Sequence, residues 1–198
     1  TIDKDTVIKA KTWLIDPTNL TVSDATAYET TLGNGTDTLI QTNNATGSDD
    51  GNIYINDTID WTSTAKLTLD AYNNIYINKA ITATNGGKLA LYYGQGAGSS
   101  GNTSNYYVNA KVNLSAGDNF FTKKGNDASE TTWKVITSLG SVGSTTGTDL
   151  QGINGNLSGN YVLGADIDAS GTSSWNSGAG FNPIGTYFQG NFDGFGHT

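Results

Sequence analysis

The sequence predicts an all-β fold, and three features of its 198 residues support this. Strong helix formers are rare, since the chain has no Arg or Met and only two Glu. Thr, Gly, Asn and Ser make up 93 of the 198 residues, and short runs of Ile, Val, Tyr and Phe alternate with them as in strands and turns. The middle of the chain also repeats itself, which argues against disorder because each copy has aliphatic pairs to bury.

The repeat predicts the architecture. Residues 52–73 and 74–95 match without gaps at 10 of 22 positions, and a third copy follows near residue 107 after a shift of 31. This period is too short for a propeller blade of about 40–45 residues, and the spacing lacks the leucine-rich signature. We therefore expect a right-handed parallel β-helix, a solenoid with coils of about 22 residues whose short strands stack at ~4.8 Å.

Alternation along each strand assigns the faces of this β-helix. The side chains expected to point inward are Ile53, Ile55, Ile75, Ile77, Tyr106 and Val108. The tyrosines between them point outward, and Asn56, Asn78 and Asn109 align at the turn that follows. Stacked Asn side chains can bond to one another and to the neighbouring backbone at such corners.

Three regions follow from the pattern. Residues 1–51 are expected to form the first coils and a surface excursion. Residues 52–136 form the regular coils, with a protruding Gly/Ser-rich insertion at 94–105. Residues 137–198 continue as further coils, and since no polar capping element follows them we expect the segment to belong to a longer rod.

Charge and composition exclude several functions. A net charge of −8 with ten scattered lysines does not suit nucleic acid, which binds clustered Lys and Arg. Disulfides and thiolate metal sites require cysteine, and the chain has none. No apolar run reaches the ~20 residues that membrane insertion needs. The absence of cysteine suits a secreted protein that crosses an oxidising compartment.

Three stretches carry a family resemblance. Residues 13–22, WLIDPTNLTV, are followed by the coils at 51–95. Residues 137–198 contain YVLGADID, FNPIG and FQGNFDGFGHT in that order. Together these segments resemble large bacterial exoproteins of the filamentous-haemagglutinin type, which use two-partner secretion.

The resemblance implies a β-helical adhesin shaft on the bacterial cell surface, exported through a partner transporter in the outer membrane. The family's secretion domain carries N-P-N-L and N-P-N-G-I motifs, whereas this chain has only DPTNL at residues 16–20. We therefore expect that the segment lies downstream of that domain and that a domain outside this chain engages the transporter.

Catalytic and metal sites are not expected, and no cofactor is implied. The single histidine, His197, falls in a Gly-rich turn, which favours a structural role. Asp57, Asp60 and Asp70 are replaced by other residue types one coil later. Two acidic segments could offer oxygen ligands to Ca²⁺, Asp49-Asp50-Gly51-Asn52 and Asp166-Ile167-Asp168, but neither has the spacing of a known calcium loop, so both are interpreted as solvated surface.

An outward row of tyrosines is the best candidate for ligand binding. Tyr54, Tyr76 and Tyr107 are expected to form a flat exposed ladder, with Lys66 and Lys88 on another outward row. Sugars stack on such rings, although Tyr also serves simply as a good strand residue. The insertion at 94–105 is a second candidate, a loop for recognition or a tolerated flexible insertion.

Seven N-x-[ST] sequons offer glycosylation sites, a number close to chance for this composition. They are Asn19, Asn34, Asn44, Asn56, Asn102, Asn113 and Asn156. The expected function is a non-enzymatic structural or receptor-binding segment of a secreted adhesin, attaching to host cells, glycans or other bacteria. The alternative is a carbohydrate-active β-helix enzyme or a glycan-binding module, which two carboxylates converging in a groove would favour.

Overall fold

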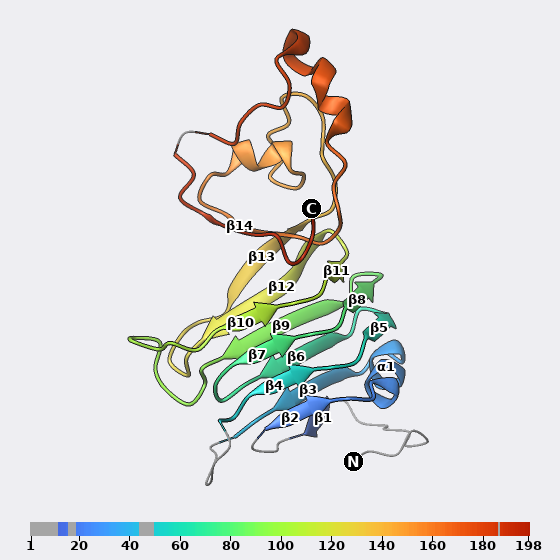
Figure 1. Ribbon diagram of the computed structural model, residues 1–198, viewed down its shortest axis with the longest axis vertical. Coiled ribbons are helices and arrows are strands. Elements are labelled where there is room, and N and C mark those ends of the chain that lie inside the picture. The colour runs from blue at the N-terminus through green and yellow to red at the C-terminus, as the bar shows by residue number, and fades with distance from the viewer. Residues whose placement is uncertain (1–11, 16–18, 44–49, 186) are drawn as a thin grey trace.

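The computed structural model describes residues 12–15, 19–43, 50–185 and 187–198 (Figure 1). The described part contains short strands, one α-helix and two 3₁₀ helices. The strands are β1 Thr12–Ile15, β2 Leu20–Val22, β3 Asp37–Gln41, β4 Ile53–Ile55, β5 Ile59–Thr62, β6 Lys66–Asp70, β7 Ile75–Ile77, β8 Ile81–Thr84, β9 Lys88–Tyr93, β10 Tyr106–Val108, β11 Val112–Leu114, β12 Gly117–Lys124, β13 Thr131–Ile136, β14 Asn160–Leu163 and β15 Asn191–Asp193. The helices are α1 Thr26–Gly33 and the 3₁₀ segments Gln151–Gly155 and Ser170–Gly178.

The strands form three sheets. Sheet A has the order β1-β3-β6-β9-β12-β13-β14-β15, sheet B the order β10-β7-β4-β2, and sheet C the order β11-β8-β5. Three successive segments of the chain each give one short strand to sheet B, one to sheet C and one to sheet A, and equivalent strands pair in parallel. The prediction of a β-rich fold with parallel strands is confirmed.

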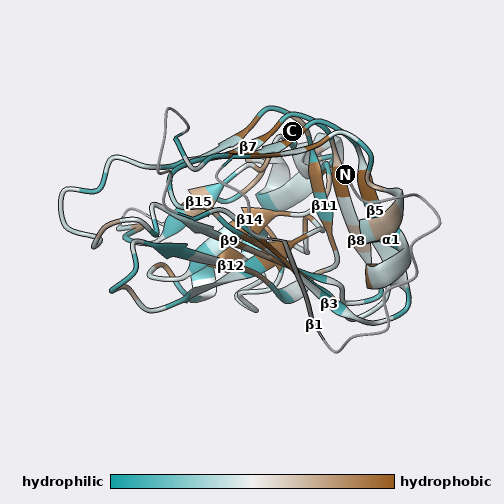
Figure 2. Cartoon of the chain, turned by 90° about the horizontal axis from the view of Figure 1, so that it is seen from below, coloured by the Kyte–Doolittle hydropathy of each residue, from teal (hydrophilic) through white to brown (hydrophobic). Residues whose placement is uncertain are grey.

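The strand register follows the sequence repeat. Ile53 pairs with Ile75, and Ile59 pairs with Ile81. Each pair is 22 residues apart, and the third copy keeps the register at 31 because the insertion at 94–105 lies between β9 and β10. Viewed along the long axis, the three sheets surround a common interior (Figure 2).

Apolar side chains fill that interior as the alternation predicts. The isoleucines of β4 and β7 are fully buried. Tyr106 and Val108 are half-buried and pack against the same core. The aligned asparagines form the expected ladder: the Nδ2 of Asn78 donates to Asn56 Oδ1, and the Nδ2 of Asn109 donates to Asn78 Oδ1, each at 2.8 Å.

Helix α1 departs from the expectation of an almost purely β chain. It covers β5 and buries Ala27, Tyr28, Thr31 and Leu32 on one face. These residues recur at spacings of three and four, which is the period of a helix with one buried face. Tertiary packing therefore overrides the weak helix propensity of its three threonines. Strands β1, β2 and β3 are the other regular elements described within residues 1–51. Residues 1–11, 16–18 and 44–49 lie outside the described residues.

A second departure is a reversal of strand direction in sheet A. β12 pairs in parallel with β9 but antiparallel with β13, and β14 and β15 then run parallel to β13. Beyond the reversal the two faces of the sheet bury different clusters. Val135 and Val162 face the main core, whereas Ile136, Tyr161 and Leu163 join a separate core with Ile153.

Residues 137–198 have less regular structure than the preceding segments. They contribute only β14 and β15 to sheet A, joined by turns and the two 3₁₀ helices. This region forms the upper part of the molecule in Figure 1. The end of the region returns to the main core, where Phe195 is buried against Phe120 with ring centroids 4.5 Å apart.

Candidate functional site

The three outward tyrosines form one column on the outside of sheet B. Tyr54 pairs with Tyr76 and Tyr76 with Tyr107 in the strand register. Their ring centroids are 4.9 Å apart at both steps, and the ring planes lie within 7° and 13° of parallel. The sequence thus placed these residues on one line, and the structure brings their rings into direct contact.

This geometry corrects the expected flat ladder. Rings lying side by side in one plane would collide at this spacing, so each ring instead overlaps the face of the next. Both faces of Tyr76 are therefore covered by its neighbours. The column offers its ring edges and hydroxyl groups to solvent, together with one terminal ring, Tyr107, which is 41% exposed on the edge strand β10.

A cleft lies at the insertion 94–105, and one residue of its wall, Asp50, acts electrostatically on Tyr76 of the column. It has a volume of about 290 Å³ and is lined by backbone and polar groups that include Asp50, Tyr72 and Asn102. Burial, together with neighbouring Tyr54, Tyr107 and Asp50, raises the pKa of the Tyr76 hydroxyl. Tyr76 therefore presents a neutral hydroxyl group under the influence of the Asp50 carboxylate, an arrangement that suits a neutral polar ligand better than an anion.

The insertion itself is internally bonded. The Nδ2 of Asn102 donates to the carbonyl oxygens of Gly94 at 2.8 Å and Gly98 at 3.2 Å, and its Oδ1 accepts from the backbone N–H of Ser104 at 3.0 Å. Ser104 Oγ then bonds to Asn73 Oδ1 at 2.6 Å. These contacts give the loop a defined shape above the cleft.

The two lysines of the expected second row lie on a different sheet. Lys66 and Lys88 are neighbours in sheet A, and the Lys66 ammonium lies 5.7 Å from the centroid of the Phe121 ring. That distance is typical of a cation–π contact. The lysine row therefore belongs to the outer surface of sheet A and does not extend the tyrosine column of sheet B.

The sequons differ in their surroundings. Asn34 and Asn56 are exposed. The amide of Asn102 is held within the insertion, the Nδ2 of Asn113 donates to Thr82 Oγ1 at 3.0 Å, and the Oδ1 of Asn19 accepts from the Asn52 backbone at 2.7 Å.

For the remaining sequons, Asn156 Oδ1 accepts from the backbone N–H of Ser158 at 3.3 Å. Asn44 lies outside the described residues.

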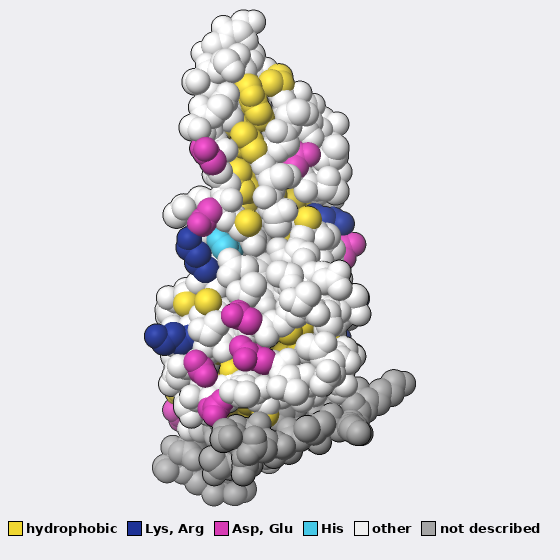
Figure 3. Space-filling view, turned by 90° about the vertical axis from the view of Figure 1, so that its right-hand side faces the viewer, with side chains coloured by type: hydrophobic (Ala, Val, Ile, Leu, Met, Phe, Trp, Pro, Cys, Tyr) yellow, Lys and Arg dark blue, Asp and Glu magenta, His cyan; other side chains and the backbone are white. Residues whose placement is uncertain are grey.

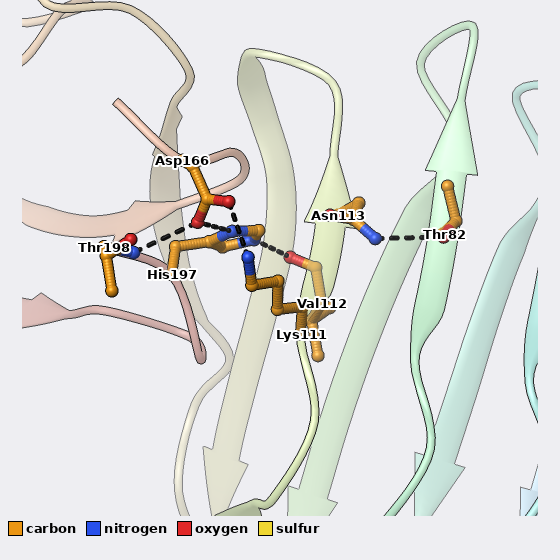
Figure 4. Close-up of polar contacts among 7 residues, drawn as sticks. All are labelled: Thr82, Lys111, Val112, Asn113, Asp166, His197 and Thr198. Atoms are coloured by element: carbon orange, nitrogen blue, oxygen red, sulfur yellow. Dashed lines mark hydrogen bonds and ion pairs between the residues drawn. The ribbon is translucent and has the colours of Figure 1, made fainter. Parts of the chain in front are cut away.

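The single histidine belongs to a polar cluster that fastens the last residues to β11 (Figure 4). The side chain of His197 is only 1% exposed, with Nε2 2.9 Å from the Val112 carbonyl oxygen and Nδ1 3.2 Å from Asp166 Oδ1. Asp166 also bonds to the Lys111 ammonium at 2.5 Å and to the Thr198 N–H at 3.1 Å.

Both ring nitrogens of the histidine face oxygen acceptors, so the ring serves as a tie between segments. Lys111, the Thr198 N–H and His197, in that order, hold the pKa of Asp166 well below its ordinary value. The carboxylate is therefore the charged centre of the cluster. The space-filling view shows the histidine beside a lysine and an acidic side chain at mid-height (Figure 3).

The acidic residues considered for catalysis are dispersed. Asp57 Oδ2 accepts from the Ala25 N–H at 3.1 Å, and Asp70 Oδ2 accepts from Gln41 Nε2 at 3.3 Å. Asp60 lies with Glu29 in an open groove of about 390 Å³ between α1 and sheet C, where Glu29 Oε1 accepts from the Asp60 N–H at 2.9 Å. Glu29 was not among the residues singled out from the sequence, because its approach to Asp60 depends on the unexpected helix.

The two acidic segments considered for Ca²⁺ differ in their contacts. Asp49 lies outside the described residues, and Asp50 lines the cleft under the insertion. Asp166 is engaged as described, and Asp168 Oδ1 accepts from the Ser170 N–H at 2.8 Å. Among the described residues, no group of three or more His, Asp or Glu side chains is placed to hold a metal ion.

Comparison with known proteins gives a single partial similarity. A stretch of the chain is 49% identical over 61 residues to Halomucin from Haloquadratum walsbyi, an alignment that covers 25% of this chain. The match spans about 1% of the length of Halomucin. No protein-family model matches the chain, and no solved structure matches it. In the part of the chain that the structure describes, no helix has the length and apolarity to cross a membrane.

Proposed function

We propose that this chain is a non-enzymatic segment of a secreted surface adhesin, built as a right-handed parallel β-helix. The resemblance to filamentous-haemagglutinin-type exoproteins and the partial similarity to Halomucin support an extracellular role. The parallel register of three sheets around one core supports the β-helix. Export by an outer-membrane transporter through another domain remains part of this proposal.

The tyrosine column is the feature that carries the binding proposal. A β-helix shaft needs polar outer positions, yet here three aromatic rings occupy one outward row and end on an exposed ring at an open sheet edge. The open face of Tyr107 can stack against the C–H face of a sugar. The hydroxyl groups of the column and Asp50 in the neighbouring cleft can bond to sugar hydroxyls.

The test is a glycan-array measurement with the full chain and two matched variants. Tyr107→Ala removes the terminal ring of the column, and we expect it to weaken glycan binding about three- to ten-fold, the value of one aromatic stack. Tyr187→Ala is the control, because Tyr187 is 79% exposed but lies outside the column. Equal binding by the two variants and the unmodified chain would remove the column from the proposal.

The enzymatic alternative has one observation in its favour, the pair of carboxylates Glu29 and Asp60 in one groove. Glycoside hydrolysis uses two carboxyl groups about 5–9.5 Å apart on either side of the bond. Incubating the chain with neutral and acidic polysaccharides, beside a Glu29→Gln variant, tests this role. Product formation that the variant abolishes would replace the adhesin proposal with an enzyme.

A further inference from the structure

Residues 151–167 and 182–198 are two units in contact through positions 31 residues apart, and only the first of them begins with a 3₁₀ helix. The side chain of Gln151 bonds both to the carbonyl oxygen and to the N–H of Asn182, each at 3.1 Å. Asn154 Oδ1 accepts from the Gly185 N–H at 2.8 Å. Asn160 Oδ1 accepts from Asn191 Nδ2 at 2.7 Å, where β14 and β15 pair in parallel.

A glycine precedes the strand in each unit, and the glycine of the second unit permits this close stacking. Gly159 and Gly190 are 31 residues apart, each directly before the first residue of a strand. A Cβ on Gly190 would lie 2.0 Å from the Gly159 carbonyl oxygen, so no other residue fits there without displacing the backbone. The contact between units therefore requires glycine at position 190, whereas a Cβ on Gly159 would meet the Tyr161 ring of its own unit.

Equivalent apolar residues have different environments in the two units. In the first unit Ile153 is fully buried and Tyr161 is 2% exposed. Their counterparts in the second unit are Ile184 and Phe192, and Phe192 is 45% exposed. Together with Phe188, the counterpart of Leu157, they line an apolar pocket of about 220 Å³.

The strand beside this pocket has one open edge. β15 pairs with β14 on one side and is the last strand of sheet A on the other. Open edges are usually guarded by charged side chains. The only acidic side chain of the second unit, Asp193, accepts instead from the Tyr106 hydroxyl at 2.6 Å and from the Phe195 N–H at 2.9 Å. Figure 3 shows hydrophobic side chains gathered in a band over this upper part of the molecule.

We propose that the apolar face of residues 182–198 is a stacking interface that accepts one further unit of the same kind. The incoming unit adds a parallel strand to β15, with Gly and Asn before an aromatic residue, and continues the apolar rows begun by Ile153, Leu157 and Tyr161. The contact between the two existing units is the template for this interface. The inference rests on the stacked coils of the proposed shaft and is independent of sugar binding.

The test appends a copy of residues 168–198 directly after Thr198 of the full chain and follows amide hydrogen exchange over residues 187–193. A matched control appends the same residues in scrambled order. We expect the true copy, and not the scrambled one, to slow exchange of these amides at least ten-fold. The true copy should also reduce binding of an apolar dye to the pocket of Ile184, Phe188 and Phe192.

The second variant is Phe192→Ser, made in the original chain and not in the appended copy. Because Phe192 is exposed, this change leaves the unextended chain folded, and it should abolish the protection given by the copy. Equal exchange with the true and scrambled copies would overturn the proposal. So would a dimer of the unextended chain that already protects residues 187–193, since the occupant would then be a second molecule. Glycan binding enters neither readout, so failure of the adhesin proposal is seen separately.

Discussion

The two stacked regions of the molecule differ in how completely their apolar rows are covered. In residues 50–124 apolar residues pair with apolar residues: isoleucine pairs with isoleucine between β4 and β7, and the isoleucines of β7 pair with Tyr106 and Val108 of β10. Side-chain amides bond from segment to segment in both regions, through Asn78 in the first and through Gln151, Asn154 and Asn160 in the second. The first region encloses its apolar rows, whereas the rows of the second end at Phe192, which is 45% exposed, and at the half-buried Ile184 and Phe188.

This difference indicates that middle layers and outer layers of the stack are stabilised by different contacts. A middle layer is covered from both sides, so its inward residues need only be apolar and of similar size. An outer layer is held from one side, and its position then depends on directional bonds such as the Gln151 bridge. The predictions below test this contrast.

The largest effect is expected from a charge in a middle layer. Ile77 is fully buried between β4 and β10, so Ile77→Asp leaves an unpaired carboxylate in the core and should cost more than about 4 kcal/mol, enough to prevent folding. Tyr76→Ser, one residue earlier on the outer face, should lose about 1 kcal/mol of ring stacking and still fold. Equal circular-dichroism melts for the two variants would contradict the assignment of faces.

The next effect compares the two units of the second region. Ile153→Ala empties a fully buried position and should lower the free energy of unfolding by about 3 kcal/mol. Ile184→Ala changes the equivalent half-buried position and should cost about 1 kcal/mol. Chemical denaturation of both variants measures the difference, and equal losses would mean that the outer layer is as well packed as the inner one.

A smaller effect is expected at the Asp166 cluster, and it depends on pH. Since its partners lower the pKa of Asp166, the carboxylate stabilises the folded chain above its ordinary pKa of 3.8, and this contribution is lost as the pH falls below that value. Asp166→Asn should therefore melt earlier than the unmodified chain at about pH 5, and the gap should narrow toward about pH 2. If the difference in melting temperature between the two proteins stays constant from about pH 5 to about pH 2, the charge of Asp166 is not its cause.

The smallest effect is expected in the asparagine ladders. Asn78 bonds to a partner on either side, so Asn78→Ala should cost about 1 kcal/mol. Asn191 bonds to one partner, and Asn191→Ala should cost about half as much. Thermal melts of the two variants give the comparison, and a larger loss for Asn191 would reverse the contrast between middle and outer layers.

Sequence reasoning was most successful where a contact repeats residue by residue. The pairing of Ile53 with Ile75 and the ladder through Asn78 follow from identical residues 22 apart, because the strand spacing brings identical positions together. The line of the tyrosine column was predicted for the same reason. The overlap of the rings was not, since it depends on side-chain rotation, which a repeat leaves open.

Features that occur once in the chain were missed. Helix α1 has no second copy, and the sequence pattern assigns its residues to the first coils and a surface excursion. The groove that joins Glu29 to Asp60 depends on that helix and was missed with it. The spacing of 31 between the last two units rests on few identities, among them Ile153 with Ile184 and Asn160 with Asn191, too few to distinguish from chance in an Asn-rich chain.

The turn between β12 and β13 has a consequence for the path of the chain. It reverses the strands of sheet A, and the second core, with Tyr161 and Leu163, lies on the opposite face of that sheet from Val162. A reversal of strand direction alone would invert the hand of the crossover between two parallel strands. A change of the sheet face that the connection crosses would also invert it. Both occur together, so the two inversions cancel, and the crossover from β13 to β14 keeps the hand of the crossovers that precede β12.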